Sequence, residues 1–354
     1  HVRSRRQRQM CIRDSLECAL PTSHGDALYY HLVLSKVWID SGLDYAYRNV
    51  CGALMTGVFD HFYVLAQLML GSGLKAHVVS QYFHFLGSTG LAALICIQYF
   101  RKKPVIGIIG AIAFLTFKHS PDVFFYPKND GYMASMALIT ALMIVDKNWL
   151  LKNESKYRHL LIGLLLGLLP LIKLSGLLIT APLSIYYVIQ QRKNLNKWMS
   201  AGFVALFTCA PIFIRNYIYI GNPFFPGFSS LFPGLMSEEM VSTYTYYMSN
   251  PLSLSSFLEN LYIFLTPKLG FIALIILVIL KRNVPPISRN LFTLSLISFV
   301  IYILTNGGIV APRFMFHLLF LNLFAGLIYL AQFNIQKMTL LLLLIVLALS
   351  LIHI

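Results

Sequence analysis

Four charged residues stand where the sequence is otherwise apolar or tightly turned. Asp26 and Asp130 each precede an apolar helical pattern. Lys173 interrupts a long apolar run, and Arg313 follows the glycine-bearing segment NGGIVAP. A carboxylate in a low-dielectric cleft can take a proton from a hydroxyl nucleophile, and fixed cations stabilise a phosphate leaving group. These residue types therefore suit transfer of a group from a phosphate ester to a hydroxyl.

The segment Pro21–Gly42, PTSHGDALYYHLVLSKVWIDSG, joins one of these acids to a helical apolar face. Apolar residues recur at helical spacing from Tyr30 to Trp38, which predicts a helix on a membrane surface with Trp38 and Lys36 in the headgroup layer. Asp26 stands one turn before Tyr30, at the helix start, where the helix dipole favours a carboxylate. Asp26 is thus either a site residue or a helix N-cap.

The composition points to a membrane. The 354-residue chain is 57% hydrophobic and 12% charged, with a mean hydropathy of +0.70. Apolar runs of this density predict an all-α polytopic membrane protein. The formal net charge of +15 comes without a basic polar domain, so we expect no nucleic-acid partner. The five cysteines lack paired spacing, so the sequence indicates neither a disulfide framework nor a cysteine metal site.

Both ends of the chain look foreign. The opening HVRSRRQRQMCIRDS and the closing LSLIHI resemble translated sequencing-adaptor read-through. We therefore expect a foreign leader at 1–15 and a native protein that begins earlier and continues further. Residues 16–76 are expected to form a first outer loop with two juxtamembrane helices and a catalytic acid. A transmembrane bundle with an outer loop at 220–264 is expected over 77–331, and a last span with a foreign end over 332–354.

About ten spans are predicted, several with apolar cores short for a bilayer. A second surface-lying or re-entrant helix, Thr56–Leu70, precedes them and carries Asp60 and His61. The predicted spans are Val78–Phe100, Pro104–Ser120, Lys128–Val145, two passes within Leu160–Gln190, Trp198–Ile218, Pro267–Leu280, Asn290–Thr305, Pro312–Ala331 and Lys337 to the end.

The run Leu160–Gln190 is read as two passes because Pro170, Lys173 and Gly176 stand in its middle. The distribution of basic residues decides between one pass and two. With two passes, the basic loops at 101–103, 147–158, 192–197 and 281–289 all fall on one side, which is the cytoplasmic side by the positive-inside rule. With one pass, the loop at 192–197 and everything after it would change sides, and the basic loops would no longer share one side.

The same topology gathers the awkwardly placed charges on the outer side. These are Asp26, Asp130, Lys173, Arg215 and Arg313. Charges inside a membrane are costly and by default mark functional sites.

Five motifs then occur in an order that resembles a known family. They are GDALYYHLVLSKVWIDSG, PKNDGYMASMALITAL, GLLLGLLPLIKLSG, IRNYIYIGNPFFPGF and APRFMFHLLFLNLFAG. Together they resemble the GT-C superfamily of integral-membrane glycosyltransferases, in the branch of the aminoarabinose transferase, protein O-mannosyltransferase and lipopolysaccharide-core galacturonosyltransferase. Members place the acidic first outer loop after a first span. The resemblance therefore implies that one span is missing at the front.

The resemblance implies transfer of a sugar from a polyprenyl-phosphate carrier to an acceptor at the outer face of a bacterial inner membrane. Asp26 matches the first-loop acid that acts as general base, and Asp130 the second-loop acid that supports the site. Lys173 and Arg313 match basic positions near the donor phosphate. Arg215 and Asn216 match the start of the RNY…GNP segment that closes the site from the side. We expect Arg215 to bind the donor phosphate, and the residues expected to bind substrate are Tyr30, His31, Asn216 and Asn222.

Metal dependence stays open. Ala27 follows the first acid where several relatives carry a second acid, and Gly131 follows Asp130, which weakens the case for a divalent cation. No other cofactor is expected. The acceptor is a lipid, a glycan or a protein, and the sequence does not decide among them.

Two other functions compete. Broken helices and isolated charges also occur in transporters and lipid-sugar flippases, although the chain shows no internal repeat. A noncatalytic membrane scaffold would have no need of the acids. Each of these residues also has an alternative structural role: a helix cap for Asp130, snorkelling side chains for Lys173 and Arg215, and an interface anchor for Arg313.

Overall fold

The structure, a computed structural model, describes residues 31–49, 53–54, 57–71, 73–116, 128–151, 155–225, 231–232, 252–265, 284–306 and 315–332. Every regular element in these ranges is helical, so the predicted all-α class is confirmed for the described part of the chain. The helices are α2 (Val33–Asn49), α3 (Asp60–Leu70), α4 (Leu74–Tyr99), α5 (Pro104–Thr116), α6 (Asp130–Val145), α7 (Lys156–Ile172), η4 (Leu174–Gly176), α8 (Leu177–Gln190), α9 (Leu195–Ile220), α11 (Leu254–Leu265), α13 (Pro286–Asn306) and α14 (Phe316–Leu330).

Three of the described helices are long and apolar enough to cross a membrane: Leu74–Tyr99, Leu195–Ile220 and Pro286–Thr305. Helix α9 exposes Phe203 and Phe207, which are 73% and 77% exposed, as expected of a lipid-facing surface. Five further apolar helices are shorter than a usual span. The membrane assignment is therefore supported, while the count of about ten spans stays a prediction.

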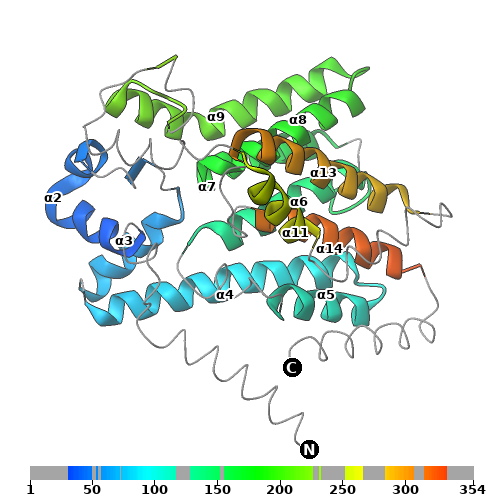
Figure 1. Cartoon of the computed structure of the whole chain (residues 1–354), viewed down its shortest axis with the longest axis horizontal. Coiled ribbons are helices and arrows are strands. Elements are labelled where there is room, and N and C mark those ends of the chain that lie inside the picture. The colour runs from blue at the N-terminus through cyan, green and yellow to red at the C-terminus, as the bar shows by residue number, and fades with distance from the viewer. Residues whose placement is uncertain are drawn as a thin grey trace, which may run out of the picture.

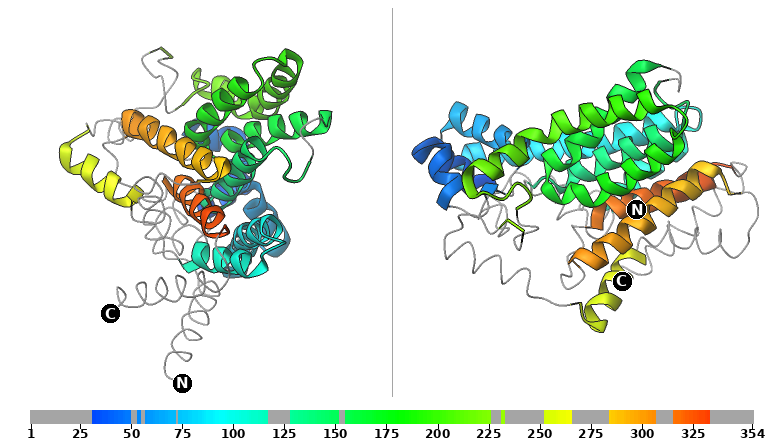
Figure 2. Two further views of the ribbon diagram at one scale, coloured as in Figure 1. Left: turned by 90° about the vertical axis from the view of Figure 1, so that its right-hand side faces the viewer. Right: turned by 90° about the horizontal axis from the view of Figure 1, so that it is seen from above.

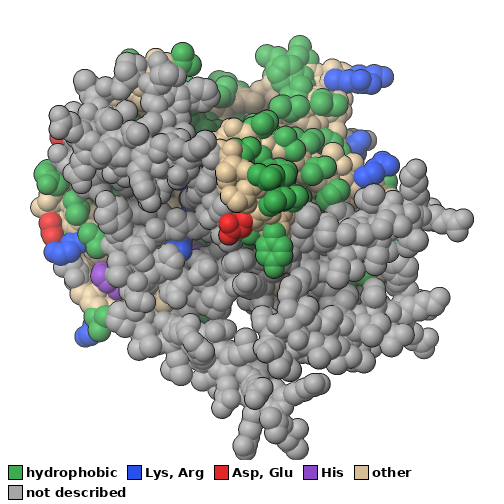
Figure 3. All heavy atoms as spheres, in the orientation of Figure 1, with side chains coloured by type: hydrophobic (Ala, Val, Ile, Leu, Met, Phe, Trp, Pro, Cys, Tyr) green, Lys and Arg blue, Asp and Glu red, His purple; other side chains and the backbone are tan. Residues whose placement is uncertain are grey.

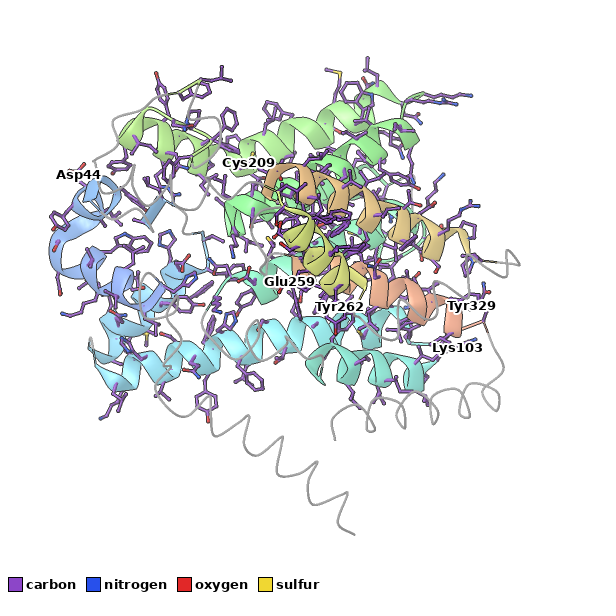
Figure 4. All side chains as sticks on the ribbon, in the orientation of Figure 1. Asp44, Lys103, Cys209, Glu259, Tyr262 and Tyr329 are labelled. Atoms are coloured by element: carbon purple, nitrogen blue, oxygen red, sulfur yellow. The ribbon has the colours of Figure 1, made fainter. Side chains whose placement is uncertain are left out.

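The helices of the bundle run alternately up and down. Tyr99 Oη, at the end of α4, donates to Asp146, which follows the end of α6, over 3.1 Å. At the same end, Lys103 donates to the carbonyl of Ala331, after α14. Figure 4 shows Lys103 and Tyr329 at this end and Asp44 at the opposite one.

The exposed basic loops gather at the Lys103 end, which we call the basic end of the bundle. Figure 3 shows Lys and Arg side chains there, while the described surface between the two ends is largely hydrophobic in this view. Short connections between helices and the first turn of α13 carry these exposed residues, which are Arg101, Lys102, Lys103, Lys147, Arg192, Lys193 and Arg289. This asymmetry matches the charge bias from which sidedness was predicted.

Arg158 is an exception to that charge count. It was included among the loop charges, but its side chain is 1% exposed. Its guanidinium donates to four backbone carbonyls at and after the end of α6, those of Met143, Asp146, Trp149 and Leu151. A helix leaves its last carbonyls without partners in the helix, and a cation there also suits the dipole. Arg158 therefore closes the end of α6.

The predicted break within Leu160–Gln190 is present, and the chain turns back at it. Thr180 Oγ1 of α8 lies 3.4 Å from the Leu166 carbonyl of α7, and His159 Nδ1 lies 2.5 Å from Tyr187 Oη. Both pairs are symmetric about Lys173, so α7 and α8 form an antiparallel hairpin. Pro170 cannot donate to Leu166, and Thr180 supplies the missing donor.

Small residues allow α7 and α9 to lie close together. A Cβ on Gly163 would come within 2.2 Å of the Ala201 carbonyl oxygen, and one on Gly167 within 2.4 Å of that of Ala205. The spacing of four residues on both helices is the small-residue pattern that brings helix backbones together in membranes.

Helices α2 and α3 group at the end of the bundle opposite the basic end (Figures 1 and 2). Helix α2 confirms the helix predicted from the Tyr30–Trp38 pattern over its described part, and it kinks at Gly42, where φ of +82° favours glycine. Trp38 does not lie in a headgroup layer as predicted. It is 6% exposed and packs against Tyr47 and His61. Lys36 is exposed and pairs with Asp40.

Helix α14 lies inside the bundle. Every one of its residues is buried, and Ser288 and Ser295 of α13 donate to its Ala325 and Leu318 carbonyls. Helix α11 occupies the last part of the segment predicted as an outer loop, so that segment is helical at its end.

Candidate functional site

A buried ion pair lies at the end of the bundle opposite the basic end. Lys173 Nζ donates to Asp130 Oδ1 over 2.5 Å, and the two side chains are 15% and 1% exposed. The two residues are 43 positions apart in the sequence, so the tertiary fold and not the local chain brings them together. Lys173 points into the protein and does not snorkel outward, contrary to one of the two readings of its sequence position.

Helix ends position both residues. Asp130 is the first residue of α6, and Asn129 is the N-cap, without a side-chain capping bond. Lys173 ends α7 with an extended backbone, φ −158° and ψ 132°, before the short turn η4. The sequence forces the chain out of the helix here, because Pro170 weakens the last turn of α7 and Gly176 allows close packing on Leu169. The Asp130 carboxylate accepts a hydrogen bond from Lys173 and does not cap a helix.

A second buried carboxylate lies beside the first. Asp60 begins α3 and is 1% exposed. Its Oδ1 accepts a hydrogen bond from His31 Nδ1 over 2.5 Å. Its Oδ2 accepts from the Gly57 amide over 2.8 Å and from Asn129 Nδ2 over 2.7 Å. Because Asn129 adjoins Asp130, the two carboxylates belong to one polar cluster.

The Asp60 carboxylate is held in its charged form. Burial raises the pKa of this carboxyl, whereas the attraction of His31 and the three hydrogen bonds lower it. The net pKa lies below the ordinary value of 3.8. A carboxylate with this pKa is a poor proton acceptor near neutral pH, so Asp60 orients His31 and Asn129 rather than acting as a base.

Glycine brings the Asp60 turn against the helix break. The Val58 amide donates to the Leu171 carbonyl over 3.0 Å. A Cβ on Gly57 would lie 1.7 Å from the Ile172 carbonyl oxygen, so only glycine fits. The start of α3 therefore docks on the last turn of α7, next to Lys173, and joins the Asp60 cluster to the ion pair.

Aromatic rings line this cluster on the α3 and α4 side. Phe59 stacks on Tyr132, with ring centroids 4.0 Å apart and planes at 4°. Tyr63 Oη lies 3.2 Å from His84 Nδ1, and the Tyr132 hydroxyl donates to the Phe83 carbonyl. Stacked rings with satisfied hydroxyls make a rigid wall.

Arg215 lies on the α2 side of the cluster. It donates to the Leu54 carbonyl over 2.6 Å and to Asn216 Oδ1 over 3.0 Å, and stands 5.0 Å above the Tyr47 ring. These contacts tie α9 to α2 and the segment after it. Asp60 also interacts electrostatically with Arg215. Arg215 thus lies near the Asp60 part of the cluster.

The predicted substrate residues differ in what they contact. His31 belongs to the cluster through Asp60. Asn216 is fully buried, and its Nδ2 has no hydrogen-bond partner within the described residues. Asn222 accepts from the Phe224 amide over 3.0 Å, in the turn that follows the left-handed Gly221. Asn222 therefore shapes the end of α9, which does not support a direct substrate contact.

Three predicted site residues, Asp26, Tyr30 and Arg313, lie outside the described residues. Within the described ranges, no group of three or more His, Cys, Asp or Glu side chains lies close enough to hold a metal ion.

No protein-family model, curated protein or solved structure matches this chain.

Sequence reasoning missed three members of this cluster. Asp60 and Asn129 were visible as polar residues in or beside apolar runs, but their partners are distant in sequence. The third is His317 of α14, which is 1% exposed and interacts electrostatically with Asp130 and Lys173. An imidazole within the apolar run FMFHLLF was the only signal for it.

Proposed function

We propose that this chain is an integral-membrane glycosyltransferase. It moves a sugar from a polyprenyl-phosphate carrier to an acceptor hydroxyl at the outer face of the membrane. The observation that carries the proposal is the buried Asp130–Lys173 pair at a helix break. Removing water from a charge that is buried among apolar helices costs on the order of several kcal/mol. Buried charges are therefore retained where a functional site needs them.

The reaction needs three tasks that these residue types can perform. An acceptor oxygen attacks the anomeric carbon, and the bond from that carbon to the phosphate oxygen breaks. The electron pair of the broken bond leaves with the phosphate, where Lys173 and Arg215 stabilise the added charge. The acceptor proton goes to a carboxylate, which we assign to Asp26, and attack from the far side of the sugar inverts its configuration.

The Asp130 carboxylate has a supporting task. Its bond to Lys173 holds the ammonium group in place before the donor binds, so less freedom is lost when the phosphate arrives. The Asp60 cluster fixes the start of α6 through Asn129 and thereby fixes Asp130. A site prepared in this way stabilises developing charge with little rearrangement.

Charge distribution supports the assignment to the outer face. The exposed basic loops lie at one end of the bundle and the Asp130–Lys173 pair at the other. By the positive-inside rule, the basic end faces the cytoplasm. The site then faces outward, where a lipid-linked donor is the expected source of an activated sugar.

The test is a transfer assay in membranes from cells that express the chain. Donors are labelled polyprenyl-phosphate sugars, and the label is followed into lipid, glycan and protein fractions. Wild-type membranes are expected to move the label, and Asp26→Asn and Lys173→Met to reduce transfer by roughly 10² or more. No transfer from any donor in wild-type membranes overturns the proposal.

The exposed pair Lys36–Asp40 of α2 supplies matched controls. Its side chains are 48% and 50% exposed and 2.7 Å apart, so it repeats the chemistry of the buried pair in water. Asp40→Asn and Lys36→Met are expected to leave transfer unchanged. Loss of transfer in the controls equal to that in the site variants would contradict the assignment to Asp26 and Lys173.

The rival function, transport of a lipid-linked sugar, has a distinct outcome in the same system. In proteoliposomes with donor on one side only, a transporter moves intact labelled lipid across the bilayer without releasing its sugar. The break between α7 and α8 is the feature that favours this rival, because discontinuous helices form transporter sites. Movement of intact lipid without sugar release would replace the proposal.

A further inference from the structure

Helix α3 has polar residues on its buried face and apolar residues on its exposed face. Asp60 and Gln67 are buried. Phe62, Leu65 and Met69, spaced at i, i+3 and i+7, are 41%, 51% and 74% exposed. This spacing places the three apolar side chains on one face of the helix. A helix that lies on a protein surface in water has the opposite arrangement.

The first half of α4 is inverted in the same way. Its exposed residues Val79, Phe83 and Leu86 are apolar, and the stripe continues along the helix to Leu94 and Ile97. Because α4 is long and apolar enough to cross a membrane, this stripe is the surface expected to contact lipid. The buried face of α4 carries polar side chains, which are Ser80, Gln81, His84, Ser88 and Thr89.

The apolar faces of α3 and α4 form one continuous surface. Residues 71–73 join the end of α3 directly to the start of α4. At the beginning of α3, the ring centroids of Phe62 and Phe83 are 5.0 Å apart, and Tyr63 Oη lies 3.2 Å from His84 Nδ1. Because both ends of α3 meet α4, α3 lies antiparallel against the first part of α4 (Figure 1). The lipid-facing stripe of α4 therefore extends onto α3.

Charge distinguishes α3 from the neighbouring helix α2. The exposed face of α2 carries the ion pair Lys36–Asp40. Helix α3 has no Lys, Arg or Glu, and its one Asp, Asp60, is buried. Lys75, in the first turn of α4, is exposed just beyond the end of α3. An apolar face without charge, flanked by a cation, is typical of a helix that meets acyl chains and ends in the headgroup layer.

The length of α4 gives the depth of α3 in a bilayer. Tyr99 ends α4 just before the basic residues 101–103, so it marks the limit of the hydrocarbon at the basic end. The helical rise from Phe83 to Tyr99 is about 24 Å. The hydrocarbon core of a bilayer is about 30 Å thick. Phe83 and the adjoining Phe62 therefore lie about one helical turn below the opposite surface of the hydrocarbon, and deeper if α4 is tilted.

We propose that α3 is a re-entrant helix whose exposed face, formed by Phe62, Leu65 and Met69, contacts the lipids of the leaflet opposite the basic end. Acyl chains contact Phe62 and Leu65, and Met69 lies near the headgroups. The sequence allowed a surface-lying or a re-entrant helix, and the antiparallel packing on α4 selects the re-entrant one. Asp60, at the deep end of α3, then lies at acyl depth on the face turned away from lipid. This placement of α3 does not depend on whether the protein is a glycosyltransferase or a transporter.

The test measures depth in the full chain, placed in nanodiscs of phosphatidylethanolamine and phosphatidylglycerol. In a background with serine for the native cysteines, single nitroxide labels are attached to Phe62→Cys, Leu65→Cys and Met69→Cys. Collisions with oxygen, which concentrates in hydrocarbon, are compared with collisions with a water-soluble nickel chelate. Leu86→Cys on α4 is the lipid control and Asp40→Cys on α2 is the water control, because both positions are exposed.

The ratio of oxygen to nickel-chelate collisions is expected to fall in the order Phe62, Leu65, Met69. A helix along the bilayer normal separates Phe62 from Met69 by about 10 Å of depth. Phe62 and Leu65 are expected to resemble Leu86, and all three positions are expected to exceed Asp40. Equal ratios at the three positions would show a helix lying flat on the surface, and ratios equal to that of Asp40 would place α3 in water. Either result would overturn the inference.

A second measurement keeps the native cysteines, so it does not depend on the folding of the serine background. A photoreactive benzophenone amino acid replaces Leu65 or, as the control, Asp40. Illumination in the same nanodiscs is expected to attach phospholipid to the chain at Leu65 and not at Asp40, as detected by the mass of the protein. A crosslink to a second copy of the chain without a lipid adduct would show that this face is a protein interface. No adduct of either kind at Leu65 would place it in water, and both results would overturn the inference.

Discussion

Removing both charges of the Asp130–Lys173 pair is expected to harm folding less than removing one. Lys173→Met alone leaves the Asp130 carboxylate, which is 1% exposed, without its partner. Loss of one partner from a buried pair costs about 3–5 kcal/mol, because the other charge stays desolvated. Asp130→Leu alone is expected at the lower end of that range, since Lys173 is 15% exposed and its long side chain can partly reach water.

The double variant Lys173→Met with Asp130→Leu is expected within about 1 kcal/mol of wild type, because hydrophobic replacement of a buried pair is often neutral or stabilising. Because each single variant costs at least about 3 kcal/mol and the double variant at most about 1 kcal/mol, the coupling energy of the cycle is at least about 5 kcal/mol. The exposed pair Lys36–Asp40, treated identically, is expected to couple by about 0.3–0.5 kcal/mol. The contrast between the two cycles isolates the effect of burial.

The assay is equilibrium unfolding in mixed micelles, with helix content and tryptophan fluorescence as independent probes. Coincident transitions are required before free energies are compared. Single variants that each cost under about 1 kcal/mol would show that the pair is solvated. A double variant that costs the sum of the two singles would show that the residues do not interact in the folded protein. Either result would contradict a buried, coupled ion pair between Asp130 and Lys173.

Three more predictions concern the supporting structure. Asp60 has a pKa below 3.8 when folded, so its contribution to stability is complete above the pKa of the unfolded chain and is lost as the pH falls through the folded pKa. Asp60→Asn is therefore expected to weaken the pH dependence of the thermal midpoint below about pH 4, and an unchanged slope there would contradict this. Arg158→Met is expected to lower the free energy of unfolding by about 3 kcal/mol or more, because four carbonyls lose a charged donor. A change under about 1 kcal/mol in the same unfolding assay would show that these carbonyls find other partners. Gly167→Val is expected to separate α7 from α9 and to lower the thermal midpoint. Gly202→Ala is expected to leave the midpoint unchanged, because open space surrounds Gly202. Equal shifts of the midpoint in the two variants would contradict the close packing of α7 on α9.

Elements that depend on local sequence were predictable. Apolar runs located most of the described helices, and Pro170, Lys173 and Gly176 located the break between α7 and α8. Each signal is local: proline removes a donor, and a charge interrupts an apolar face. Boundaries shifted by a few residues, as at α4, which begins at Leu74 and not at Val78. Helix α11 was missed because its segment is polar at the start.

Contacts between distant residues were not predictable from one sequence. His31 and Asp60 are 29 positions apart, and Asp130 and Lys173 are 43 apart. Composition marks such residues as costly but does not name their partners. Trp38 shows the same limit, since an aromatic residue on an amphipathic helix suits a headgroup layer or a protein core equally well, and packing of α2 on α3 decided for the core.

The most direct measurement uses the double variant as a folded protein without the two charges. Wild type and Lys173→Met with Asp130→Leu are placed in nanodiscs with a labelled polyprenyl-phosphate sugar and a mixture of membrane acceptors. Release of sugar from the lipid is followed over time. Wild type is expected to transfer the sugar, and the double variant, equally stable, is expected to transfer it at least roughly 10²-fold more slowly. Equal transfer by both proteins would contradict the claim that this ion pair lies in the active site, and intact donor with wild type would contradict the claim that the protein is a glycosyltransferase.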